Sequence, residues 1–273
     1  MDSRRFPRPT RRAALTTLGT TGLSALAGCA ALGLGTTDSS NERSGAGGTD
    51  DSGAPTANGS SQSSSDESNS TTVRTSSQTT PLGVSLDGNP VQGSADAPVD
   101  LYYWSDFQCP FCKRFEVNTR PKLVQDAVAG GTVRLVYLEL PNIGSASFRA
   151  AAHSKCVWRQ VRDDDPSVYL DWHEAVFDAQ EKPNSGWATK ERLLGITESV
   201  DGVSRDAVAS CLDGEKQSVK SSMRADVDRA KDHSIAVTPS FLFHDRDADE
   251  TQTINGAQPY TRFASVVKSM TGE

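Results

Sequence analysis

The sequence predicts an α/β fold in which a strand–helix–strand unit is followed by a helical insertion and a strand–strand–helix ending. Three observations predict this order. Residues 99–104 and 132–138 are β-branched and aromatic runs on either side of a helix-forming stretch. Residues 145–233 place apolar side chains at helical spacing. Residues 240–254 show the pattern of two strands joined by a turn, and residues 259–270 have the apolar stripe of a last helix.

The strand–helix–strand unit comes first. Residues 99–104 predict a buried strand because Val, Tyr and Trp favour that conformation. The helix that follows should break or restart at Pro121, which lacks a backbone N–H, and should end at Gly130-Gly131. Residues 132–138 predict the second strand. Two strands joined by a helix imply parallel pairing with a right-handed crossover.

The insertion and the ending follow. Within residues 145–233, apolar pairs such as Trp172 with Val176 recur one helical turn apart. Strands 240–244 and 251–254 predict a hairpin with its turn between them. The last helix aligns four side chains on one face: Tyr260, Phe263, Val267 and Met270.

The segment Cys109-Pro110-Phe111-Cys112 indicates redox chemistry. Because it joins the first strand to its helix, Cys109 should lie at a helix N-terminus, where unpaired N–H groups and the helix dipole favour a thiolate. Pro110 suits the first helical position, since its missing N–H has no partner there. A Cys109 thiolate can attack a disulfide, and Cys112 can resolve the mixed disulfide. This chemistry requires no cofactor.

Two other interpretations of a CxxC motif are half of a zinc site and a structural disulfide. Zinc takes four ligands, and the sequence holds no second CxxC and no HxxxH. We therefore expect no metal site. A structural bridge would close a strained loop across the first turn of a helix. The histidines are scattered without ligand spacing: His153, His173, His233 and His244.

Residues 1–28 resemble a targeting segment, with five arginines against one acidic residue. The pair Arg11-Arg12 resembles a twin-arginine export signal that lacks the usual Phe and Lys. The weakly apolar stretch 13–27 is too short and too polar to predict a membrane span. Leu26-Ala27-Gly28-Cys29 resembles a lipobox. A lipid on Cys29 would anchor the exported protein to the outer face of the cytoplasmic membrane; the alternative is a signal that happens to end in cysteine.

Residues 29–81 are rich in Ser, Thr, Gly and Asp and have almost no large apolar side chains. Such a stretch cannot bury enough surface to offset its ordering entropy, so we expect a disordered linker. The folded part should then consist of residues 82–144 and 234–273 as one α/β domain, interrupted by the helical insertion 145–233.

The charge balance is acidic. The chain has 28 basic and 35 acidic residues, and without residues 1–28 it keeps 23 and 34, a net charge of −11. Nine of the basic residues are lysines and 19 are arginines. An acidic, lysine-poor surface resembles that of salt-loving organisms, although an ordinary acidic exported protein is the alternative. Nucleic acid is not an expected partner.

The remaining two of the five cysteines predict a structural disulfide. Cys156 and Cys211 are left once Cys29 is assigned to the lipid and Cys109 and Cys112 to the redox pair. Outside the cytoplasm such a pair is more often bonded than free. Both lie on helix-patterned runs, so their bond would join two helices of the insertion. The alternative is two unlinked buried thiols that pack as small apolar groups.

Several segments together resemble the DsbA-like thiol–disulfide oxidoreductases of the thioredoxin superfamily. They follow the family's order over about residues 90–270: Ala95-Asp-Ala-Pro98, Ser105-Asp-Phe-Gln-Cys-Pro-Phe-Cys112, Trp172-His-Glu-Ala-Val-Phe177 and Val237-Thr-Pro-Ser-Phe241. The resemblance implies a thioredoxin fold (βαβ…ββα) with an inserted helical domain. It also implies that Pro239 is cis and packs against the redox pair, while the backbone of Thr238 pairs with an extended substrate.

The sequence departs from the family at the redox pair. Tyr103 stands where oxidases often carry an acid, and Leu138 where a basic residue is common. Asp106 and Glu139 are therefore candidates for the buried carboxyl that exchanges a proton with the resolving cysteine. Phe111 replaces the histidine of the strongest oxidants and removes one source of thiolate stabilisation.

The leading hypothesis is an exported thiol–disulfide oxidoreductase that introduces disulfides into exported proteins through the pair Cys109 and Cys112. Its expected partners are exported proteins with thiols or disulfides and a membrane-bound or small-molecule redox partner that recycles the pair. Two alternatives stay open. One is a disulfide reductase or isomerase with the same site, and the other is a non-enzymatic surface lipoprotein that binds peptides or a metal.

Overall fold

The computed structural model describes residues 72–272. The predicted targeting segment, the lipobox with Cys29 and most of the predicted linker lie outside these residues. Within them, no helix is both long and apolar enough to cross a bilayer.

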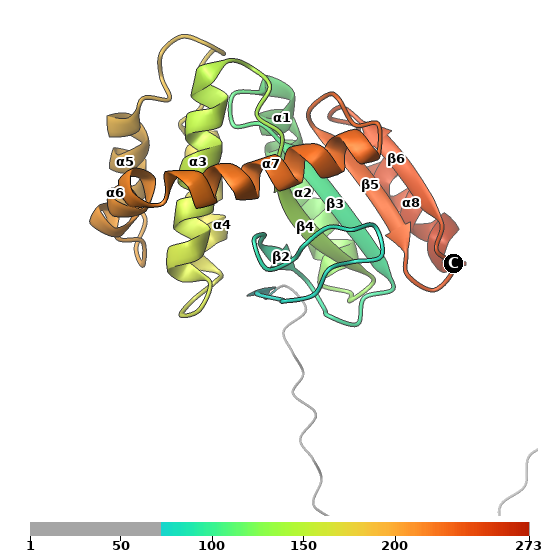
Figure 1. The fold of residues 1–273 in the computed structure, drawn as a ribbon. Coiled ribbons are helices and arrows are strands. Elements are labelled where there is room, and N and C mark those ends of the chain that lie inside the picture. The colour runs from blue at the N-terminus through green and yellow to red at the C-terminus, as the bar shows by residue number, and fades with distance from the viewer. Residues whose placement is uncertain (1–71, 273) are drawn as a thin grey trace, which may run out of the picture. The chain divides into compact units, whose positions relative to one another are not determined.

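One six-stranded sheet, with strand order β1-β2-β4-β3-β5-β6, forms the centre of the fold (Figure 1). Its strands are β1 (Val73–Arg74), β2 (Val91–Gln92), β3 (Val99–Ser105), β4 (Val133–Glu139), β5 (Ser240–Asp245) and β6 (Thr251–Asn255). The β3–β4 pair is parallel and the other pairs are antiparallel. The parallel pair confirms the predicted crossover, and β5–β6 confirms the predicted hairpin.

The helices that belong to this sheet also follow the prediction. They are α1 (Pro110–Asn118), α2 (Arg120–Leu123), a π-helical segment (Val124–Val128) and the C-terminal α8 (Tyr260–Thr271). The chain breaks after α1 at Thr119 and restarts with Pro121 in the first turn of α2, because a proline there loses no helical hydrogen bond. The order β3–α1–β4 followed later by β5–β6–α8 is the predicted thioredoxin fold.

Five helices separate β4 from β5: α3 (Ser145–Val161), α4 (Val168–Asp178), α5 (Lys190–Glu198), α6 (Arg205–Gly214) and α7 (Lys216–Asp232). Figure 1 shows α7 running across α3 toward the sheet, and α7 contacts both α3 and β4. Asp226 of α7 connects this helix to both neighbours. It pairs with Lys155 of α3 at 2.6 Å and accepts the backbone N–H of Glu139 in β4 at 3.1 Å.

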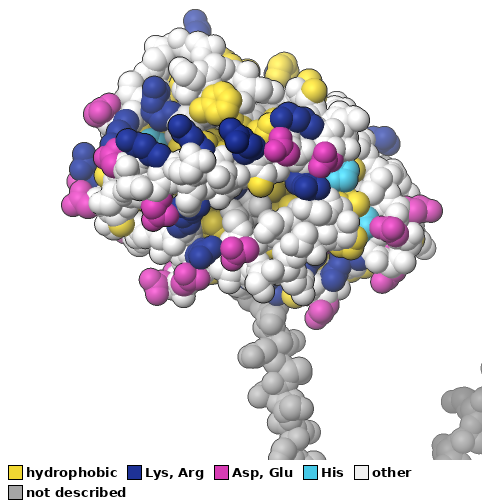
Figure 2. All heavy atoms as spheres, in the orientation of Figure 1, with side chains coloured by type: hydrophobic (Ala, Val, Ile, Leu, Met, Phe, Trp, Pro, Cys, Tyr) yellow, Lys and Arg dark blue, Asp and Glu magenta, His cyan; other side chains and the backbone are white. Residues whose placement is uncertain are grey.

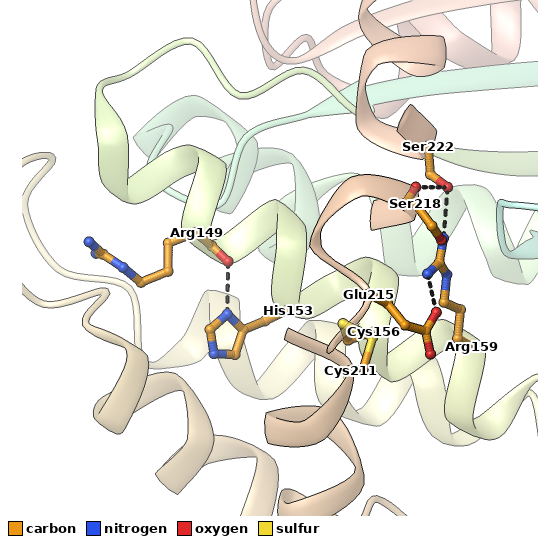
Figure 3. The surroundings of a disulfide bond; sticks show 8 residues. All are labelled: Arg149, His153, Cys156, Arg159, Cys211, Glu215, Ser218 and Ser222. Carbon is orange, nitrogen blue, oxygen red and sulfur yellow. Dashed lines mark hydrogen bonds and ion pairs between the residues drawn. A yellow bond between two sulfur atoms is a disulfide. The ribbon is translucent and has the colours of Figure 1, made fainter. Parts of the chain in front are cut away.

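The predicted disulfide between Cys156 and Cys211 is confirmed, with 5.8 Å between the Cα atoms. It joins α3 to α6 (Figure 3). A second connection lies one turn further along α3, where Arg159 pairs with Glu215 at 2.7 Å and donates to Ser222 at 3.1 Å. Together these contacts hold the α6–α7 corner against α3.

The expected end of the linker at residue 81 is wrong. Val73–Arg74 forms the edge strand β1, antiparallel to β2, and a bridge joins Thr79 to Ser85. The side chain of Val73 is 1% exposed, so it belongs to the core. The sequence did not predict this strand for two reasons. The stretch before it is polar, and a strand of two residues shows no detectable alternation.

The sheet separates two hydrophobic clusters. Along β3, Val99, Leu101 and Tyr103 belong to the larger cluster, whereas Tyr102 and Trp104 belong to the smaller one. This alternation is the period of two expected for a strand buried on both faces. The larger cluster includes apolar residues of α1, α8 and the insertion, so the redox segment lies on that face.

Candidate active site

The two free thiols of the described residues lie at the start of α1. Cys109 is its N-cap, Pro110 is in the first turn, and the backbone N–H of Cys112 donates to the carbonyl of Cys109 at 3.0 Å. Cys109 is buried, with 3% of its surface exposed, whereas Phe111 in the same turn is 49% exposed. Cys112 is fully buried. The two thiols differ in position: Cys109 caps the helix, whereas Cys112 faces inward in the first turn of a helix that packs on the sheet.

Cys109 is the thiol that ionises readily. Hydrogen bonding by the Cys112 side chain lowers the pKa of Cys109 to about 6, in spite of burial, which acts in the opposite direction. The Thr238 side chain and the backbone N–H groups of Phe111 and Cys112 also favour the thiolate. The thiolate is therefore the favoured form of Cys109 at neutral pH.

Cys112 has the opposite character. Burial, followed by its interaction with the Cys109 sulfur, raises the pKa of Cys112 well above its ordinary value. It shares a core cluster with Tyr103, Phe115 and Phe241, whose rings pack on each other with centroids 4.5 to 5.0 Å apart. Tyr103, at the position where an acid was expected, thus contributes an apolar ring to this cluster.

The segment before β5 closes one side of the pair. The Thr238–Pro239 peptide bond is cis, as predicted. The Cys109 thiol donates to the carbonyl oxygen of Thr238 at 3.2 Å, which confirms that the two segments are adjacent. Val237 is 51% exposed beside them. Backbone and apolar side chains therefore surround the reactive sulfur.

Asp106 holds the redox loop in place. One carboxylate oxygen accepts the backbone N–H of Gln108 at 2.8 Å, and the other accepts those of Asn142 and Ile143 at 2.9 and 3.0 Å. The backbone N–H of Asp106 points to the Cys112 sulfur at 3.5 Å. Asp106 is therefore a positioning residue that joins the redox loop to the loop after β4.

Sequence reasoning missed two side-chain amides, those of Gln180 and Gln108, that hold the redox loop. Gln180 donates to the carbonyls of Phe107 at 2.6 Å and Cys109 at 3.2 Å. Gln108 donates to the carbonyl of Ile143 at 2.7 Å and accepts the backbone N–H of Asn184 at 3.0 Å. Gln108 was visible as the neighbour of Cys109, but its partners lie far along the chain and no spacing indicates them.

The insertion also packs directly on this loop. Phe107 contacts the rings of Trp172, His173 and Phe177 on α4, with centroids 4.9 to 5.6 Å apart. These three residues belong to the α4 segment singled out in the sequence. Its aromatic face serves to support the loop that carries Cys109.

Glu139 is the buried carboxyl with the most altered ionisation near the site. It ends β4 beside Ser105, the residue before Asp106. Burial raises its pKa to about 8, and Lys155 opposes this shift while the charges of Asp226 and Asp106 add to it. Glu139 therefore holds a proton at neutral pH, close enough to Asp106 for their charges to interact.

Known proteins share this arrangement. Residues 85–260 match a family described as Thioredoxin. The chain belongs to the thioredoxin family. Disulfide bond formation protein D of Bacillus subtilis is 30% identical over 59% of this chain and 70% of its own length. The probable disulfide bond formation protein D of Bacillus anthracis is 30% identical over 54% of this chain and 66% of its own length.

Solved structures share the fold of this thioredoxin family member. The crystal structure of oxidised BdbD from Bacillus subtilis matches with a TM-score of 0.60 and 26% identity, over 69% of this chain and 96% of that one. The α-DsbA1 protein of Wolbachia pipientis has the same fold, with a TM-score of 0.58 and 18% identity over 71% and 96%. The chain is a DsbA-like thiol–disulfide oxidoreductase.

Proposed function

We propose that this oxidoreductase acts as an oxidase, with Cys109 as its nucleophilic cysteine and Cys112 as its resolving cysteine, and that it transfers a disulfide to exported proteins. One observation carries the proposal: the pKa of Cys109 is lowered to about 6 while burial raises that of Cys112. A stabilised Cys109 thiolate favours the reduced form of the pair, and a pair with a favoured reduced form oxidises other thiols.

The proposed reaction begins with the Cys109–Cys112 disulfide. A substrate thiolate attacks the Cys109 sulfur, which breaks the bond to Cys112 and forms a mixed disulfide. The released Cys112 sulfur takes up a proton because its pKa is high. A second substrate thiolate then attacks the substrate sulfur of the mixed disulfide and releases Cys109 as a thiolate. The substrate loses two electrons and two protons. The pair gains both electrons and, on Cys112, one proton, while the other proton is released to solvent because Cys109 leaves as a thiolate.

The surroundings of Cys109 suit an extended substrate of any sequence. The Thr238 backbone lies 3.2 Å from the sulfur and can pair with a substrate main chain. Phe111 and Val237, each about half exposed, offer apolar contacts near the sulfur, in the chain segments that hold it. Unfolded proteins present both main chain and apolar side chains, so this surface fits newly exported chains.

The reduction potential of the pair tests the direction of transfer. We expect equilibration with glutathione to give a value well above about −270 mV, the level of a reducing thioredoxin, and toward the roughly −120 mV of a strong oxidase. The purified chain should also oxidise a reduced, unfolded protein. The Cys156→Ala/Cys211→Ala variant, which keeps the redox pair, is the matched control. A potential near that of thioredoxin would support the reductase alternative instead.

We also propose that the protein works outside the cytoplasm, held by a lipid on Cys29 and exported by the twin-arginine-like signal. The support is the resemblance of residues 26–29 to a lipobox and the Cys156–Cys211 bond, which is typical of oxidising compartments. Mass spectrometry of the mature protein should find a lipid-modified Cys29, and Cys29→Ser should release the protein from the membrane fraction. An unmodified N-terminus elsewhere contradicts the anchor but leaves the enzymatic proposal intact.

A further inference from the structure

An apolar groove with a basic border lies on the insertion, away from the groups that perform the redox chemistry. Its volume is about 650 Å³. The floor and walls include Phe148 and Ala152 of α3, Leu212 of α6, and Val219, Met223 and Val227 of α7. Figure 2 shows hydrophobic side chains flanked by Lys and Arg in the region where α3 and α7 lie in Figure 1.

The periodicity of α7 builds one wall of this groove. Val219, Met223 and Val227 recur every four residues and form an apolar row. Lys216, Lys220 and Arg224 form a basic row beside it, also every four residues. Both rows line the groove, so an apolar seam runs alongside a line of positive charge.

The border has an excess of positive charge on a protein that is otherwise acidic. Five basic side chains line the groove, and the single acidic one, Asp228, pairs with Lys231 at 2.9 Å. Within residues 72–272, Lys216, Lys220 and Arg224 are exposed and form no ion pair. Lys216 and Arg224 interact with Asp213 and Asp228 only through longer-range electrostatics. Like charges four residues apart are unfavourable for the isolated helix, so the basic row is complementary to an anionic occupant.

One end of the groove lies close to the redox loop. Phe148 is 52% exposed at that end. Its neighbour Ser147 accepts a hydrogen bond from the side chain of Gln108 at 3.3 Å, and Gln108 precedes Cys109. A partner seated in the groove would therefore lie beside the surface from which the reactive cysteine is reached.

The walls are fixed before any partner binds. The Cys156–Cys211 bond begins one turn beyond Ala152 on α3 and ends beside Leu212 on α6. Arg159 adds its bonds to Glu215 and Ser222 at the turn into α7 (Figure 3). A groove held open in this way loses little conformational entropy on binding.

We propose that this groove binds an acidic amphipathic helix of a partner protein. An amphipathic helix lays its apolar face into a groove between helices, and acidic residues along its flank would meet the basic row of α7. A concave site favours a helix over a membrane surface, which is contacted by protruding side chains. The readout is binding and does not depend on the direction of electron transfer, so this proposal and the oxidase proposal can fail separately.

The probe is a labelled synthetic helix of about 18 residues with Leu at i, i+3, i+4 and i+7 and Glu elsewhere. Fluorescence anisotropy should detect binding to the full chain. The triple variant Lys216→Glu/Lys220→Glu/Arg224→Glu should weaken binding at least tenfold, and a peptide with Lys in place of Glu should bind that variant better than it binds the wild type. The control is Arg262→Glu/Lys268→Glu, which reverses two exposed charges on α8 and should leave binding unchanged.

A second variant tests the apolar component. Phe148→Ser changes an exposed side chain and should weaken peptide binding at least threefold while leaving the alkylation of Cys109 unchanged. Equal affinity of the wild type and the triple variant would overturn the proposal. Binding of the chain to vesicles of anionic phospholipid in place of the peptide, or its self-association through the groove, would overturn it in favour of a membrane surface or a second copy.

Discussion

At the scale of single residues, the two thiols differ because of where one helix begins. Cys109 caps α1 and meets N–H donors, the Cys112 side chain and the Thr238 side chain, all of which favour a negative sulfur. Cys112 lies three residues further, on the buried side of the same turn, where burial opposes the charge. The CxxC spacing thus produces one thiol that ionises readily and one that stays protonated and can resolve a mixed disulfide.

This asymmetry predicts the pH dependence of alkylation. In the reduced protein, the iodoacetamide reaction of Cys109 should rise with a midpoint near pH 6, because only the thiolate reacts and its pKa is about 6. Cys112 should remain unmodified across that range. Mass spectrometry of peptides after short exposures measures both. Cys112→Ala should move the midpoint of Cys109 upward, since the hydrogen bond from the Cys112 thiol is the largest stabilising contact and alanine cannot donate one. Modification of Cys112 first would reverse the proposed roles.

The buried carboxyl of Glu139 predicts a pH dependence of stability. Its pKa is raised from 4.5 to about 8, so the folded protein holds a proton that the unfolded chain releases. The stabilisation is fully present below about pH 4.5 and is lost as the pH rises through about 8. The Glu139→Gln variant has a neutral side chain at every pH, so it should not lose this stabilisation as the pH rises. Its free energy of unfolding relative to wild type should therefore rise between about pH 5 and 8 in urea titrations, whereas exposed Glu250→Gln should give no such trend.

At the scale of elements, local patterns predicted most of the fold. The runs at 99–104 and 132–138 became β3 and β4, and the helical periodicity of 145–233 became α3 to α7. The short strands β1 and β2 were not predicted, because two residues are too few to show the alternation of a strand. The roles of the Gln108 and Gln180 amides were not predicted because their contacts join segments 35 to 76 residues apart, which only the tertiary structure brings together.

The disulfide between α3 and α6 predicts a large contribution to stability. It closes a separation of 55 residues, and the chain-entropy model gives about 3–5 kcal/mol for a loop of that size. The Cys156→Ala/Cys211→Ala variant should lose about that free energy of unfolding in urea. The Cys109→Ser/Cys112→Ser variant, which keeps the structural bond, is the matched control. A loss below about 1 kcal/mol would indicate that the ion pair of Arg159 and the packing of α3 already hold these helices together.

At the scale of the whole molecule, the net negative charge predicts how stability depends on salt. Without residues 1–28 the net charge is −11, and the basic row of α7 concentrates positive charge on one face. Self-repulsion of an acidic surface destabilises the compact state and is weakened by salt. The midpoint of thermal unfolding should therefore rise when KCl increases from about 0.1 to 1 M, where the Debye length falls from about 10 to 3 Å. A chain with several exposed aspartates changed to asparagine, for example Asp164, Asp201 and Asp247, should show a smaller rise because fewer charges repel. A midpoint that falls with KCl would mean that ion pairs such as Lys190–Asp213, which salt screens, outweigh the repulsion.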